Sequence, residues 1–493
     1  MKNKLSINIV STFLLQFVTI VSGFIIPKSI LAAFGSEVNG LISSLTQFLN
    51  YINLIEGGVS SVIMSSLYTP LFEKNQKKID GIVTATLHFF RKLSLIFVIY
   101  TFILATIYPL TINSSFSWKY VSSLTLILSI SLLVQYCFSL TWKLLLQADQ
   151  KVYIVSFIQI LVIILNTIFT IIGIKLFSNI HLVKLISAVA FLIQPLLINY
   201  FVKKYYKINL EEPPDKDALK NRWDGFGINI AAFLNGNTDV MVLTVLSTLK
   251  NVSIYSIYSL VVTGIKSLIT SISSGIIPSL GNYYAEGNKK KLNNFFNFYE
   301  LLIYYFTFSV YSCAVILIVP FVLVYTSGIH DANYDQAIFS ILLILSIGVL
   351  CLREPYVNMA YVAGKFKEVS KFAYVEAVIN IVVSVIAVSK FGLNGVAFGT
   401  LCSMSFRTIC QICYLKKNIL FRNISKVLKK LSIYLISSLV GIFLCKYINF
   451  GYELTWIGWF IFAIKNAVVI FTINSVVTII FFRDELRLKK RGT

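Results

Sequence analysis

Ten ionisable residues lie inside long apolar stretches of this chain, where charge is otherwise rare. If these stretches cross a membrane, a charge at their centre costs about 3 kcal/mol or more unless it faces a partner or a water-filled cavity, so each is a candidate functional group. The cations are Lys28, Lys266, Arg353, Arg407 and Lys465, and the carboxylates are Glu56, Asp239, Glu300, Glu354 and Glu376.

Three of the cations are candidates for binding an anionic headgroup. Lys28 follows a proline, which frees a backbone carbonyl and can kink a helix. Lys266 lies among serines and threonines in VVTGIKSLITSISSG, and Arg353 precedes Glu354 and a second proline. Arginine suits bidentate phosphate recognition, and broken helices at membrane depth are where transporters place binding sites. The alternatives are a Lys28 that extends to the membrane surface and an Arg353 neutralised by Glu354.

The carboxylates and amides are candidates for lining a cavity or coupling an ion. Glu56 precedes two glycines, Asn237 and Asp239 belong to a run of three polar residues, and Arg407 near a helix end is expected to extend to the surface. A structural hydrogen-bond network between helices is the alternative. The histidines and cysteines show no metal-ligand spacing, so we expect no metal site or cofactor, and the coupling ion, Na⁺ or H⁺, is open. The candidates are Glu56, Asn237, Asp239, Glu354, Glu376 and Asn380.

The elements that position these residues are predicted to be membrane-spanning helices. The chain is 57% hydrophobic and 13% charged, with mean hydropathy +0.79, and its apolar runs reach the length of about 20 residues that a spanning helix needs. We predict an all-α polytopic membrane protein with about fourteen transmembrane helices. Their approximate spans are 6–32, 37–67, 93–113, 120–142, 153–174, 183–202, 226–248, 252–282, 297–326, 336–363, 371–390, 394–415, 431–449 and 456–482.

The positive charges predict the orientation. With both termini in the cytosol, inner loops and termini carry 32 Lys and Arg and outer loops carry six, which is the asymmetry of the positive-inside rule. The net charge of +22 therefore reflects topology and contact with membrane lipids, not binding to nucleic acid. The charges therefore predict a multi-pass membrane protein with both termini in the cytosol.

A repeat divides the chain. Residues 60–79 and 273–292 align without a gap at an offset of 213, with nine of twenty positions identical, and each copy ends an apolar segment and enters a basic loop. Such a repeat predicts two six-helix bundles related as parallel repeats. The predicted parts are an N-terminal bundle (1–203), a cytosolic linker (204–225), a C-terminal bundle (226–417), and two accessory helices with a basic tail (418–493).

Three stretches resemble polysaccharide flippases of the Wzx type, in the multidrug/oligosaccharidyl-lipid/polysaccharide exporter superfamily. They are IPKSILAAFGSEVNGLISSLTQFLNYINLIEGGVSSVIMSSLYTPLFEKN (26–75), NTDVMVLTVLSTLKNVSIYSIYSLV (237–261) and REPYVNMAYVAGKFKEVSKFAYVEAVINIVVSVIAVSKFGLNGVAFGT (353–400). The resemblance implies two six-helix bundles around a central cationic cavity, with alternating access driven by an ion gradient. It also implies headgroup binding by Lys28, Lys266 and Arg353.

The resemblance implies a location in the bacterial cytoplasmic membrane. It also implies movement of an undecaprenyl-pyrophosphate-linked oligosaccharide between the leaflets of that membrane, for capsule, O-antigen or a similar polymer. Partners would then be this lipid-linked substrate and, through its biosynthesis, a polysaccharide polymerase and glycosyltransferases. An ion-coupled multidrug or small-molecule exporter of the same superfamily is the alternative function. A membrane enzyme is disfavoured, because the outer loops offer only the carboxylate pair Asp331 and Asp335, which a polar turn explains.

Overall fold

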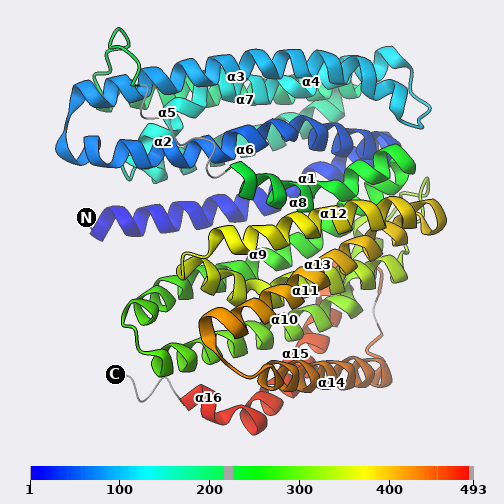
Figure 1. Ribbon diagram of the computed structural model, residues 1–493. Coiled ribbons are helices and arrows are strands. Elements are labelled where there is room, and N and C mark those ends of the chain that lie inside the picture. Colours follow the sequence, from blue (N-terminus) through cyan, green and yellow to red (C-terminus); the bar gives the residue numbers. More distant parts are fainter. Residues whose placement is uncertain (1, 216–225, 452, 488–493) are drawn as a thin grey trace. The chain divides into compact units, whose positions relative to one another are not determined.

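The computed structural model describes residues 2–215, 226–451 and 453–487, which form long helices joined by short connections (Figure 1). The chain divides into two compact units. Unit 1 comprises Met1–Phe233 with Thr248–Ser253, and unit 2 comprises Leu234–Ser247 with Ile254–Thr493. Each unit is described by itself below.

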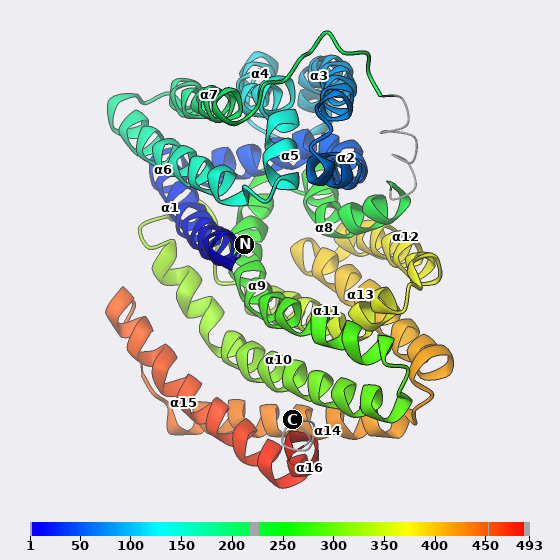
Figure 2. The ribbon, with the colours of Figure 1, turned by 90° about the vertical axis from the view of Figure 1, so that its left-hand side faces the viewer.

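Unit 1 is a helix bundle, in which α6 packs between α1 and α7, and α4 between α3 and α7 (Figures 1 and 2). Its first helix is interrupted at Gly35, whose φ of 81° is open to glycine at little cost. The helices are α1 (Lys2–Leu49), α2 (Asn53–Glu73), α3 (Gln76–Thr111), α4 (Trp118–Val134), α5 (Leu140–Ala148), α6 (Val152–Leu176) and α7 (Ile180–Tyr205).

Unit 2 contains the second half of α8, most of α9, and all later helices. Here α13 packs against α12 and α11, and α11 packs against α10. Helices α14 and α15 pack against each other and against α10. The helices are α8 (Phe226–Leu246), α9 (Leu249–Ala285), α10 (Lys289–Tyr325), α11 (Ala337–Val362), α12 (Phe366–Phe391), α13 (Leu393–Leu415), α14 (Ile424–Ile448), α15 (Trp456–Phe481) and α16 (Arg483–Arg487).

The prediction of an all-α polytopic membrane protein is confirmed. Within the described residues, twelve helical stretches are long and apolar enough to span a membrane. The first, Ser6–Glu73, is 68 residues long and contains the break at Gly35, so it covers the first two predicted spans. The seventh predicted span is α8, and helices cover the other predicted spans as well.

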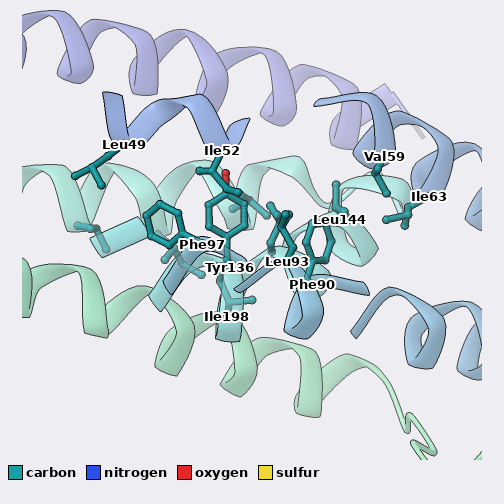
Figure 3. Close-up of a cluster of buried hydrophobic side chains, with 14 of the residues drawn as sticks. Leu49, Ile52, Val59, Ile63, Phe90, Leu93, Phe97, Tyr136, Leu144 and Ile198 are labelled. Atoms are coloured by element: carbon teal, nitrogen blue, oxygen red, sulfur yellow. The ribbon is translucent and has the colours of Figure 1, made fainter. Parts of the chain in front are cut away.

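Apolar side chains at helical spacing form the core of unit 1. Figure 3 shows Phe90, Leu93 and Phe97 of α3 in one cluster with Tyr136, whose ring centroid lies 6.0 Å from that of Phe97. These side chains are at most 2% exposed. In a water-soluble protein, burying each large apolar side chain stabilises the fold by about 2 kcal/mol. Between membrane helices the surrounding lipid is also apolar, so close packing supplies much of the stabilisation instead.

The repeated stretch forms the same turn in both units. Lys74 and Gly287, which occupy aligned positions, have φ of 54° and 70°. The next residue, Asn75 or Asn288, then caps a helix by accepting hydrogen bonds from backbone N–H groups of its first turn. The prediction of a basic loop here is therefore wrong, because the lysines that follow each cap lie in the first turn of α3 or α10.

Part of the predicted linker lies along the beginning of α3. Asp215 N–H donates to the Gly81 carbonyl at 3.0 Å, and the Gln76 amide donates to the Lys207 carbonyl at 3.1 Å. Residues 216–225, the remainder of that predicted linker, lie outside the described residues, as do tail residues 488–493. The predicted domain boundaries therefore stay predictions.

The crossing of α12 and α13 depends on two glycines four residues apart, Gly395 and Gly399. A Cβ on Gly399 would lie 2.2 Å from Ser384 Oγ and 2.7 Å from its backbone nitrogen, and small residues at this spacing let membrane helices approach closely. We expect Gly399→Val to cost about 2 kcal/mol or more by overpacking, measured as a lower unfolding temperature in detergent. The matched control is Gly275→Val, because a Cβ there meets nothing within 4 Å. An equal loss in both variants would contradict this account.

Candidate functional site

Two arginines of unit 2 share one carboxylate. Arg353 of α11 donates from Nη1 to Glu376 Oε1 at 2.8 Å, and Arg407 of α13 donates from Nη1 to Glu376 Oε2 at 2.6 Å. All three side chains, those of Arg353, Glu376 and Arg407, are buried, at 6%, 1% and 9% exposure. This arginine–glutamate cluster joins three helices, since Glu376 lies in α12.

The structure corrects two expectations about these residues. Arg353 does not form its ion pair with Glu354 but with Glu376, because adjacent residues on a helix point in different directions. Arg407 does not extend to the membrane surface; it is buried in an ion pair. The helix also runs unbroken through Pro355, so the sequence signal for a broken helix fails at this position.

Lys266 and Glu354 lie within electrostatic range of the same cluster. Both are half-buried, and Glu354 interacts electrostatically with Lys266, Arg353 and Arg407. The five side chains comprise three cations and two carboxylates, a net charge of +1. Within the described parts of the chain, Lys266 makes no ion pair of its own, so it is the cation of this group with the most freedom to engage a ligand.

A second carboxylate of unit 2, Asp239 of α8, is surrounded by neutral groups. Tyr255 donates from its hydroxyl to Oδ2 at 2.8 Å, and the Thr400 hydroxyl lies 2.8 Å from Oδ1 and 2.7 Å from Oδ2. The Asn380 amide lies 3.4 Å from Oδ1. Asp239 is 4% exposed and forms no ion pair with any described side chain. We call Asp239, Asn380 and Thr400 the Asp239 cluster.

Further oxygens extend the Asp239 cluster. The Thr400 hydroxyl lies 3.1 Å from the Val396 carbonyl, and Ser384 Oγ lies 3.5 Å from both that carbonyl and Asn380 Oδ1. A buried ionised carboxylate without a cation is costly. Carboxylate, carbonyl and hydroxyl oxygens are the ligands that hard cations prefer, so the cluster can hold a proton or a small hard cation.

The remaining predicted residues do not join these clusters. Asn237 is half-buried on α8, two positions from Asp239 and therefore on another face of the helix. In unit 1, Glu56 accepts a hydrogen bond from Tyr136 at 2.9 Å and interacts with Lys143. Lys28 is half-buried within α1. Lys28 and Lys266 belong to different units.

Glu300 belongs to a separate network that holds the accessory helices. It is fully buried on α10 and forms ion pairs with Arg422 and with Lys430 of α14, the latter at 2.9 Å. Lys430 also contacts Glu485 of α16 at 2.6 Å. Burial raises the pKa of the Glu485 carboxyl, and Lys430 opposes that shift. We interpret this network as structural.

The sequence reasoning missed three residues that complete the clusters. Tyr136, Tyr255 and Thr400 hydrogen-bond the buried carboxylates. Tyrosine and threonine are common in membrane helices, so their types alone carried no signal. Thr400 ends the stretch GVAFGT, whose two glycines lie four residues apart. This spacing is a signal of close helix packing, and it could have indicated that Thr400 lies near the neighbouring helix α12.

Comparison with solved structures identifies the fold. The chain is similar to the lipid II flippase MurJ in an inward closed conformation, with TM-score 0.76 and 16% identity over 97% of this chain and 100% of that one. It is similar to an inward-facing MATE-family multidrug resistance transporter of the MOP superfamily, with TM-score 0.69 and 14% identity over 80% of this chain and 93% of that one. It is also similar to the MATE multidrug transporter DinF-BH, with TM-score 0.60 and 15% identity over 86% of this chain and 97% of that one.

No family model and no curated protein matches the chain by sequence. At this level of identity the structural likeness establishes the fold, which these flippases and multidrug transporters share with the chain. The proteins it resembles in structure are transporters.

Proposed function

We propose that this chain is a flippase that moves an undecaprenyl-pyrophosphate-linked oligosaccharide across the bacterial cytoplasmic membrane by alternating access. Both termini would lie in the cytosol, in keeping with the distribution of Lys and Arg. The oligosaccharide would enter surface polysaccharide, with glycosyltransferases before this step and a polymerase after it.

The observation that carries the proposal is the half-buried cation Lys266 beside the arginine–glutamate cluster. The net positive charge of this group favours an anionic headgroup over a drug cation. Lys28 remains a second candidate for the headgroup. Arg353 is bound by Glu376, so we propose that it acts by maintaining the positive field around Lys266 and not by direct contact.

The extent of the structural likeness also favours a flippase. The chain is matched over 97% of its length by the lipid II flippase but over 80% and 86% by the two multidrug transporters. The multidrug transporters nevertheless keep an ion-coupled exporter of small molecules as the second candidate.

The Asp239 cluster is the proposed site of the coupling ion. Binding of Na⁺ or H⁺ would neutralise Asp239, and its release would leave a buried charge without a partner. A cation gradient could therefore drive the unit between two conformations. Glu56, bonded to Tyr136 in unit 1, is the second candidate for such a role.

Purified protein in proteoliposomes tests the proposal with a fluorescent lipid-pyrophosphate-linked oligosaccharide, whose arrival in the opposite leaflet is measured with a membrane-impermeant quencher. We expect the native chain to move this lipid. We expect Lys266→Gln to reduce the rate at least about tenfold, because a charge-assisted hydrogen bond to phosphate contributes more than 1 kcal/mol.

The matched control is Lys465→Gln, which removes a lysine from the middle of α15, where it is exposed. This variant should move the lipid at the native rate. Equal activity of the Lys266 and Lys465 variants would refute the role of Lys266. Efflux of a cationic dye without any lipid movement would replace the flippase by the multidrug exporter.

A further inference from the structure

An open cavity of about 520 Å³ lies at one end of unit 1, and none of its lining residues takes part in the proposed function. It is lined by the first two turns of α4, by the beginning of α7 with the two residues before it, and by Phe34 of α1. α4 and α7 pack side by side (Figures 1 and 2). Its volume is in the range of small-molecule sites, about 300–1,000 Å³.

A fixed imidazole forms part of the wall. His181 Nδ1 lies 3.1 Å from Asn179 Oδ1, which also accepts the His181 backbone N–H and is therefore the oxygen of that amide. His181 Nε2 lies 3.0 Å from the Tyr120 carbonyl and 2.9 Å from Ser123 Oγ. Both ring nitrogens thus contact oxygen atoms, and these contacts fix the orientation of the ring.

One lysine and one free amide group face the cavity. Lys119 lines it, is exposed, and forms no ion pair within the described chain, and no carboxylate is among the lining residues. Both hydrogen bonds that the Asn179 side chain makes with described residues use Oδ1, so its two amide N–H groups are available to an acceptor in the cavity. An exposed lysine at a cavity of this kind favours negatively charged ligands over positively charged ones.

The same cavity has an aromatic wall. The Tyr120 ring stacks on Phe116 with centroids 4.8 Å apart and planes 9° apart, and the His181 ring meets it edge-on at 4.5 Å. These contacts hold the Tyr120 ring in place, and Phe34 adds a second apolar surface. A ligand for this cavity therefore needs an anionic group, hydroxyls and an apolar surface together.

We propose that the cavity binds an acidic sugar, a pyranose ring that bears a carboxylate. Lys119 binds the carboxylate, the Asn179 amide donates to ring hydroxyls, and Phe34 and Tyr120 contact the apolar C–H groups. The inference rests on the proposed function for the source of this sugar, a unit of the transported oligosaccharide. In the proposed orientation the cavity is at the outer end of unit 1, where that oligosaccharide is released.

The test is direct binding of D-glucuronate to the full-length protein in nanodiscs of zwitterionic lipid, measured by calorimetry. D-glucose and acetate serve as the neutral sugar and the anion without a sugar ring. We expect glucuronate to bind at least about tenfold more tightly than either. Lys119→Gln should weaken glucuronate binding about tenfold, since it removes one charge-assisted hydrogen bond. Asn179→Asp should also weaken binding, because it keeps a residue that caps α7 but replaces the donor with a negative charge.

Lys175→Gln is the matched control, because Lys175 is an exposed lysine at the end of α6 that does not line the cavity. It should leave glucuronate binding unchanged. Equal binding of acetate and glucuronate, or an equal loss in the Lys119 and Lys175 variants, would overturn the proposal. A second nanodisc preparation contains the anionic lipid phosphatidylglycerol. Loss of glucuronate binding in that preparation would also overturn the proposal, because it would assign the cavity to a lipid headgroup.

Binding is measured without transport, so the two proposals fail separately. Glucuronate binding in a protein that moves no lipid-linked oligosaccharide would retain the sugar site and refute the flippase. Lipid movement without glucuronate binding would retain the flippase and refute the sugar site.

Discussion

Glu376→Ala is expected to prevent stable folding of unit 2. The change leaves Arg353 and Arg407 buried without the carboxylate that both contact at 2.6–2.8 Å. Removing one partner of a buried ion pair typically costs about 3–5 kcal/mol, and here two arginines lose a partner at once. The measurement is the unfolding temperature and the monodisperse fraction of purified protein in detergent.

Two further variants isolate the cause. Glu368→Gln lies on the same helix as Glu376 but removes an exposed pair with Lys365 at 3.6 Å, so we expect less than about 0.5 kcal/mol of change. The triple variant Arg353→Met, Glu376→Met, Arg407→Met should recover most of the lost stability, because it leaves no buried charge without a partner. If the triple variant were as unstable as Glu376→Ala, lost packing and not unpaired charge would explain the effect.

Most of the fold was predictable from the sequence, since bilayer thickness and backbone hydrogen bonding allow long apolar runs few structures other than helices. The errors fall where helices continue beyond the apolar core. α3 begins at Gln76 and not near residue 93, because Ile79, Ile82 and Val83 bury one face of a segment too polar to be predicted as a membrane span. A hydropathy average combines these apolar residues with the polar residues between them and so misses this part of the helix. The capping residue Asn75 marks where the helix begins.

The residues of the candidate site were predictable, but their partners were not. The cost of charge in a membrane is a property of each residue, so Asp239, Arg353 and Glu376 could be identified from the sequence alone. Which residues meet depends on helix rotation and on helices distant in the chain: Glu376 contacts Arg353 and Arg407, 23 and 31 positions away. Arg353 and Glu354 are adjacent in the sequence, but their side chains point in different directions on the helix.

Asp239→Asn is expected to abolish ion-driven transport while leaving the protein folded. The amide has nearly the shape of the carboxylate and can still accept from Tyr255 or Thr400, but it carries no charge for a cation to neutralise. We expect the transport rate to lose its dependence on the Na⁺ or H⁺ gradient, measured in proteoliposomes with each gradient imposed in turn. The unfolding temperature should stay near the native value or rise, because the buried charge is removed.

The variant Tyr255→Phe tests the hydrogen bonds to Asp239 independently of its charge. It removes one donor to Asp239, the hydroxyl at 2.8 Å, and keeps the charge, so a gradient should still drive transport. Loss of that donor leaves the ionised carboxylate less stabilised, and the concentration of cation needed for half-maximal transport should fall. Gradient-driven transport by Asp239→Asn would refute the assignment, because the remaining ligands of the Asp239 cluster are neutral and cannot alternate between a compensated and an uncompensated buried charge.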